Sequence, residues 1–126
     1  MEPDIVIIAG FGFRQSASLA SLESALAKAT KGGIMVDALA TVENKTQQLA
    51  PLARKLALPL IPVAAAPLAG QPTLTHSPAS VARYGAGSVA EASALAAVAH
   101  PARLLAPRSL SSDRLASCAL AESPIP

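Results

Sequence analysis

Apolar runs and helically spaced apolar positions alternate along the first half of the chain. Residues 5–9 form a continuous, mostly β-branched run, which is typical of a strand buried on both faces. Apolar residues then recur at helical spacing from Leu19 to Ala29, and the glycine pair at 32–33 ends that pattern. The alternation continues and predicts a further strand, helix and strand over residues 34–40, 46–58 and 60–63.

Prolines modify this prediction at three places. Pro51 falls inside the second predicted helix, where a missing N–H is tolerated only near the first turn, so the helix is expected to start late or to kink. Pro59 and Pro62 favour an edge position for the third strand, because an edge strand can do without one ladder donor. The following residues, 64–75, are predicted to form a mobile loop.

The second half is expected to hold two helices and two strands, over residues 78–83, 88–99, 102–106 and 114–121. Ser88 and Glu91 have the spacing of a capping box, which fixes the start of the longer helix. The two strands flank a polar turn at 109–113 and are predicted to pair as a hairpin. The closing residues 123–126 are expected to fray.

Strand–helix alternation implies right-handed βαβ units, and the hairpin would make the sheet mixed. The sequence therefore predicts an α/β fold in a single domain over residues 1–126. The expected architecture is a three-layer sandwich with a mainly parallel, mixed central sheet of about five strands and helices on both faces. No internal repeat or linker divides the chain.

Composition narrows the class of partner. Apolar residues make up 52% of the chain and aromatic residues 2%, so the core must be built largely from small side chains. The formal net charge is +2 without a run of like charges, which suits a small anion better than a nucleic-acid backbone. We therefore expect no nucleic-acid partner.

The chain is expected to be cytoplasmic. Residues 1–4 are acidic where a secretory signal would be basic, and the alanine-rich stretch 89–99 is too short to span a bilayer. A lone cysteine, Cys118, excludes an internal disulfide and is predicted to be a core residue in a reducing compartment. No membrane partner is expected.

Ligands of open α/β sheets collect at the carboxyl ends of the strands, and three segments are predicted to lie there. The first consists of Gly10, Phe11, Gly12, Phe13 and Arg14. Its glycines would let a turn expose main-chain N–H groups to an anion, and Arg14 would add guanidinium donors. The alternative is a plain strand-to-helix turn. A dinucleotide fingerprint is not complete, because Gln15 stands where its last glycine would fall.

The other two segments contain a possible helix start. In the second, Thr41 would donate to a carboxylate that Lys45 neutralises; alternatively Thr41 or Asn44 caps the next helix and Lys45 is solvated. The third segment runs from Tyr84 to Glu91, and its candidate ligand-binding residues are Gly85, Ala86, Gly87, Ser88 and Glu91. It either contacts ligand as well as capping its helix, or only caps it.

Catalytic and metal chemistry have little support in the sequence. His76 and His100 lie far apart with no cysteine at metal spacing, so no metal site is predicted. No nucleophile elbow of the Gly-x-Ser-x-Gly type is present. The catalytic residues therefore stay unassigned, and no cofactor is predicted.

At the three segments the sequence resembles the CobE family, which matches the carboxy-terminal domain of CbiG proteins in cobalamin biosynthesis. The likeness runs from about Ile5 to Ala121. It rests on residues 10–14, 40–42, 45, 52–53, 56–60, 80–81, 85, 88–91 and 94–95. Family members often have a glutamate at Gln48, a cysteine at Phe13 and a lysine near Arg108. Since the first strand begins the chain, it resembles the free-standing form of the domain.

The resemblance implies a role with corrin-ring intermediates, which carry several acetate and propionate arms. The leading hypothesis is an accessory or carrier protein that binds a precorrin or corrinoid and passes it to other cobalamin-pathway enzymes. The alternative is an enzyme, or enzyme subunit, in ring-lactone opening and release of a two-carbon fragment. A third reading is mononucleotide binding, with Asp37 as the ribose partner.

Overall fold

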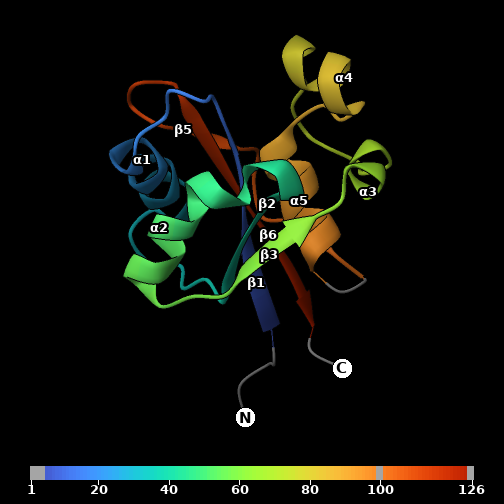
Figure 1. Cartoon of the computed structure of the whole chain (residues 1–126). Helices are drawn as coiled ribbons and strands as arrows, with labels where there is room; N and C mark the ends of the chain where they lie inside the picture. Colours follow the sequence, from blue (N-terminus) through green and yellow to red (C-terminus); the bar gives the residue numbers. More distant parts are fainter. Residues whose placement is uncertain (1–4, 99–100, 125–126) are drawn as a thin grey trace.

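A mixed sheet forms the middle layer of the structure, a computed structural model that describes residues 5–98 and 101–124. Five strands follow the order β3-β2-β1-β6-β4, and β5 also pairs with β6 (Figure 1). They are β1 (Ile5–Phe13), β2 (Ala38–Val42), β3 (Leu60–Val63), β4 (Arg103–Leu104), β5 (Ser109–Leu110) and β6 (Ala116–Pro124). The pairs β1–β2 and β2–β3 are parallel, whereas β6 runs antiparallel to its neighbours. The predicted mixed α/β sheet is confirmed.

Helices cover both faces of this sheet. The helices α1 (Leu19–Thr30) and α2 (Thr46–Leu56) lie on one face, and α5 (Val89–Ala97) lies on the other (Figure 1). Two shorter helices, α3 (Ala65–Ala69) and α4 (Pro78–Tyr84), lie on the side of α5, and a 3₁₀ turn, η1 (Glu43–Lys45), precedes α2. The three-layer arrangement expected from the sequence is therefore present.

Each face of the sheet has its own apolar core. Phe11, Leu22 and Leu49 are buried between the sheet and the α1/α2 layer, and Cys118 joins them. Burial raises the pKa of the Cys118 thiol, which confirms it as a core residue. The α5 face is packed mainly with alanine and valine. A Cβ on Gly10 would overlap the main chain of α5 at Ala90, so glycine allows the helix to lie directly on β1.

Several predicted boundaries are wrong. The expected turn at residues 10–14 is not a turn, because β1 continues to Phe13 and Gly12 pairs with Ser117 of β6. The second strand starts at Ala38 rather than at residue 34, and the predicted loop 64–75 contains α3, whose Leu68 is fully buried. Tertiary packing decides these ends, since local sequence cannot see the partner strand.

Of the two expectations based on proline, one is confirmed and one is wrong. The third strand is indeed at the sheet edge and contains Pro62. The helix around Pro51 does not start late: α2 begins at Thr46 and includes Pro51, which is exposed to solvent. Pro51 lies in the second turn of α2, further from the helix start than the prediction allowed.

The last part of the chain is more ordered than expected. β4 and β6 pair antiparallel, as the predicted hairpin required, and Ser88 caps α5 as predicted. The expected polar turn instead supplies β5, and Ser123 and Pro124 pair with β1 rather than fraying. Residues 1–4, Ala99, His100 and residues 125–126 lie outside the described residues. Among the described helices, none has the length and apolar character needed to cross a membrane.

Candidate functional site

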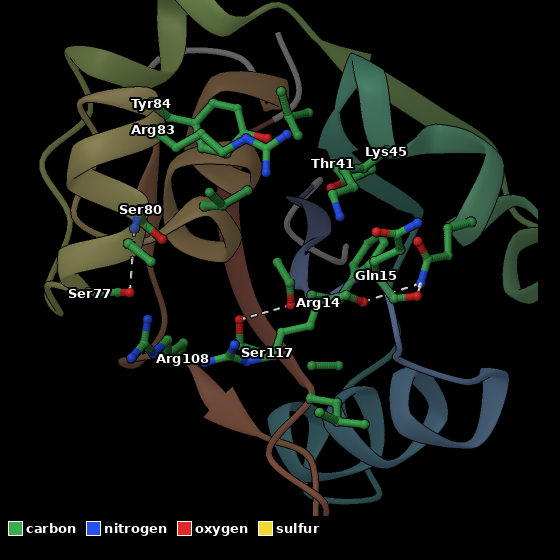
Figure 2. A pocket seen from close by; sticks show the side chains of 18 of the residues that line it. Arg14, Gln15, Thr41, Lys45, Ser77, Ser80, Arg83, Tyr84, Arg108 and Ser117 are labelled. Atoms are coloured by element: carbon green, nitrogen blue, oxygen red, sulfur yellow. Dashed lines mark hydrogen bonds between the residues drawn. The ribbon is translucent and has the colours of Figure 1, made fainter.

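A cavity of about 690 Å³ opens at the carboxyl ends of β1 and β2. Its walls come from the end of β1, the η1–α2 region, α4 and the β5–β6 hairpin (Figure 2). Five cationic side chains line it: Arg14, Lys45, Arg83, Arg108 and Arg114. No aspartate or glutamate is among the described residues that line it.

These cations have no carboxylate partner within the described part of the chain. The ion pairs found there, Lys55–Glu23 and Arg103–Glu122, lie outside the cavity. Like charges held together in a concave surface produce a positive potential that attracts anions. The cavity is therefore suited to a ligand with several negative groups.

Lys45 lies near an aromatic ring and is influenced by a second cation. Its Nζ lies 5.3 Å from the centroid of the Phe13 ring, a cation–π distance. Burial, and then the charge of Arg83, lowers the pKa of Lys45. A bound carboxylate would relieve this repulsion, so the uncompensated charges favour anion binding.

Arg14 lies on a short loop that is held from two sides. Its main-chain N–H donates to the carbonyl of Leu115, 2.9 Å away, at the start of β6. The Nε2 amide of Gln48 in α2 donates to the carbonyls of Arg14, Gln15 and Ala17 at 3.0 to 3.2 Å. These bonds need a donor, and a carboxylate has no hydrogen to donate, so glutamine rather than glutamate fits here.

Thr41 lines the cavity, but its hydroxyl is already used. It is fully buried, and its Oγ1 donates to the carbonyl of Phe11 at 2.8 Å. Neither Thr41 nor Asn44 caps α2, because that helix has no side-chain cap. The hydroxyl therefore fixes β1 against β2 rather than donating to a ligand.

Glu91 supports the cavity from behind. It is fully buried, and its carboxylate accepts hydrogen bonds from the main-chain N–H groups of Leu74, Thr75 and Arg108 and from the Thr75 hydroxyl, at 2.6 to 2.9 Å. Both oxygens are thus occupied. Glu91 thus holds in place the segment that leads to α4 and the main chain of Arg108. The buried Glu91 carboxylate is not exposed to a ligand.

The expected Gly85–Ser88 segment has structural roles instead. Gly85 ends α4 with a φ of 68°, and Ser88 accepts the Glu91 N–H at the start of α5. The adjacent Tyr84 does line the cavity, and its hydroxyl is buried without a hydrogen-bond partner among the described residues. Tyr84 and Arg83, labelled in Figure 2, form one side of the cavity.

The structure thus brings together part of the predicted set. Five predicted residues line the cavity: Gly12, Phe13, Arg14, Thr41 and Lys45. Seven do not: Gly10, Phe11, Gly85, Ala86, Gly87, Ser88 and Glu91. Sequence reasoning assigned no ligand role to Arg83, Gln48, Arg108, Arg114 or Tyr84, although Tyr84 begins the third predicted segment. These residues form no motif of recognised spacing, so only the folded chain shows that they converge.

Asp37, the ribose partner required by the mononucleotide reading, lies elsewhere. Its carboxylate accepts the Ile7 N–H at 2.8 Å, just before β2 begins. This is the amino end of the parallel strands, whereas the cavity lies at their carboxyl ends. Asp37 is not placed to bind a ribose there.

Comparison with known proteins identifies the class of this domain. The family described as "Cobalamin synthesis G C-terminus" matches residues 7–121. The crystal structure of CobE, a protein from the cobalamin (vitamin B12) biosynthetic pathway, is 33% identical, with a TM-score of 0.84 over 98% of this chain and 94% of that one.

A second solved structure agrees. Cobalamin biosynthesis protein chiG from Agrobacterium tumefaciens str. C58 is also 33% identical, with a TM-score of 0.70 over 92% of this chain and 97% of that chain. No curated protein matched the sequence. The chain belongs to the family of CobE and the CbiG carboxy-terminal domain, and it is a cobalamin biosynthesis protein.

Proposed function

We propose that this protein binds a corrin-ring intermediate by contacting the free carboxylates of that intermediate. It would serve as an accessory or carrier protein in cobalamin biosynthesis. The observation that carries the proposal is the set of five cations around a cavity whose described lining contains no carboxylate. Membership of a cobalamin-synthesis family supplies the class of ligand. Peripheral acetate and propionate arms on one macrocycle match cations that come from separate walls.

The cavity also offers apolar surface for the ring. Phe13, Val42, Val89 and Leu110 contribute to its lining together with the cations. Binding sites for organic ligands commonly combine apolar walls with a few placed polar groups, in volumes of roughly 300–1,000 Å³. The volume of about 690 Å³ falls in this range. Ring contact and carboxylate contact can therefore act together.

The test is a titration that changes only the ligand's charge. The absorption spectrum of a metal-free corrinoid with free acetate and propionate groups is followed as protein is added. The matched ligand is the same ring with those groups converted to amides. Each charge-assisted hydrogen bond contributes roughly 1.5–3 kcal/mol, so the amide form should bind at least about tenfold more weakly. Equal affinity for both ligands would contradict the proposal.

Salt gives a second measurement on the same samples. Salt screens the attraction between solvent-accessible charges, with a Debye length of about 10 Å at 0.1 M. The dissociation constant of the carboxylate ligand should rise as sodium chloride is raised from low concentration. The amide ligand should show a smaller change. Binding that ignores salt would point to apolar contact alone.

One observation supports the enzymatic alternative in ring-lactone opening and two-carbon release. Lys45 lines the cavity, and burial and Arg83 lower its pKa, which raises the share of the neutral amine, the form that can accept a proton. The same titrations, analysed by mass spectrometry for a changed corrinoid, separate the roles. A product formed by the native protein and not by Lys45→Met would support the enzyme. An unchanged ligand would support the carrier.

A further inference from the structure

The β5–β6 hairpin contains a tight turn in which Arg114 adopts a left-handed conformation. The Arg114 N–H donates to the carbonyl of Ser111 at 2.9 Å, and the Ser111 N–H donates to the carbonyl of Ala116 at 2.8 Å. The φ angle of Arg114 is 63°. A four-residue turn whose last residue is left-handed favours glycine at that place, because a Cβ is disfavoured there.

Other non-glycine residues with positive φ have an ordinary explanation. Lys31 and Ala57, with φ values of 51° and 56°, terminate α1 and α2, where a left-handed residue closes the helix. Arg114 ends no helix. Unlike those two residues, it lines the cavity.

Hydrogen bonds from three directions hold the turn in place. The carboxylate of Asp113 accepts from the hydroxyls of Ser21 and Ser111 and from the N–H of Leu115. Ser21 lies in α1, so the turn is tied to the helix layer as well as to its own hairpin. The position of Arg114 is therefore set by its surroundings, and the left-handed conformation is imposed on it.

The main chain at Arg114 lies close to the main chain at Arg14. The Arg14 N–H donates to the carbonyl of Leu115, so the two arginines leave neighbouring points of the main chain. Both line the same cavity. Two guanidinium groups placed in this way offer several N–H donors to one carboxylate or to two adjacent ones.

We propose that Arg114 is a ligand-contacting residue which, with Arg14, binds a carboxylate arm of the corrinoid. Arginine then occupies this place in the turn for binding, although glycine would make the fold more stable. This inference rests on the proposed function, and it adds the residues that would recognise one arm. It predicts effects of opposite sign: replacing Arg114 by glycine should stabilise the fold and weaken binding.

The experiment compares Arg114→Gly with Lys31→Gly. Both changes place glycine at a positive φ and remove one positive charge, but Lys31 does not line the cavity. Both variants should melt higher than the native protein, by on the order of a few degrees. For the carboxylate-bearing, metal-free corrinoid, Arg114→Gly should raise the dissociation constant about tenfold. Lys31→Gly should leave it unchanged.

A third variant, Arg114→Lys, keeps both the charge and the positive φ. It should melt like the native protein and bind with an affinity between those of arginine and glycine, because an ammonium lacks the guanidinium fork. If Arg114→Gly binds as tightly as the native protein, the Arg114 assignment is overturned and the proposed function stands. If Arg114→Gly melts lower, the idea that glycine is preferred in this turn is wrong. If the native protein does not bind, both proposals fall.

Discussion

The carboxylate of Glu91 accepts a hydrogen bond from the main-chain N–H of Arg108 at 2.8 Å, and this joins the buried helix α5 to a wall of the cavity. The same carboxylate holds Leu74 and Thr75 on the way to α4. One buried charge thus fixes the segments that precede two of the cavity's cations, Arg83 and Arg108.

Replacing Glu91 by glutamine should therefore lower the free energy of unfolding. The amide has one acceptor oxygen, and its NH₂ group would face N–H donors that the carboxylate now satisfies. Loss of bonds to a fully buried charged group costs roughly 3 kcal/mol. Urea unfolding measures this loss. Glu122→Gln, at a partly exposed pair with Arg103, is the control and should cost less than about 1 kcal/mol.

A glutamate at position 48 should weaken ligand binding. The Gln48→Glu variant replaces three N–H···O contacts by a carboxylate facing carbonyl oxygens, which should release the loop that carries Arg14, and it adds a negative charge to the cavity lining. We expect the corrinoid dissociation constant to rise about tenfold, equivalent to ~1.4 kcal/mol. Gln47→Glu makes the same charge change at an exposed neighbour outside the cavity. If the two variants bind alike, Gln48 does not position the loop.

Asp113 should contribute to stability in a defined pH range. Hydrogen bonds from Ser111, then Ser21 and then Leu115, lower the pKa of Asp113 to about 2, below its ordinary value of 3.8. Because the folded pKa is the lower one, this stabilisation is present above about pH 4 and is lost as the pH falls through 2. Asp113→Asn should thus be less stable than the native protein at pH 7, and the difference should shrink between pH 4 and pH 2. A difference that stays constant with pH would contradict the assignment.

Gly10 should tolerate no side chain. The added methyl group of Gly10→Ala would overlap main-chain atoms of α5 at Ala90, and backbone cannot move aside as a flexible side chain can. A loss of roughly 1–3 kcal/mol or more is expected in thermal or urea unfolding. Gly33→Ala is the matched control, because a Cβ there meets nothing within 4 Å. Similar losses at both glycines would show that the overlap with α5 is not the cause, because Gly33 has open space and the lower flexibility of the unfolded chain would by itself stabilise the fold.

The sequence predicted the elements whose signals are local. The β-branched run of β1, the helical spacing of α1 and the cap at Ser88 each depend on neighbours in the chain, and each element was found. Gly10 was misread because glycine marks either a turn or a close approach. Only the packing of α5 on β1 decides between them.

Only the part of the site that depends on local sequence signals was predicted. Arg14 and Lys45 follow strands that local pattern could place, and both line the cavity. Arg83 comes from the short helix α4, whereas Arg108 and Arg114 belong to the β5–β6 hairpin, which is placed by the long-range pairing of β6 with β1. Their convergence is a property of the tertiary structure and leaves no spacing signal in the chain.

The pairing of β1 with β6 joins Ile5 to Pro124, so strands from opposite ends of the sequence lie side by side in the middle of the sheet. During synthesis, β1, β2 and β3 emerge long before the strand that completes the cavity with its hairpin arginines. A folding intermediate built from the first three strands alone would present two of the five cations, Arg14 and Lys45, and no closed binding surface. An anionic ligand should therefore change neither the rate at which this intermediate forms nor the rate at which it unfolds. It should instead slow the unfolding of the complete protein, in which β6 separates from β1.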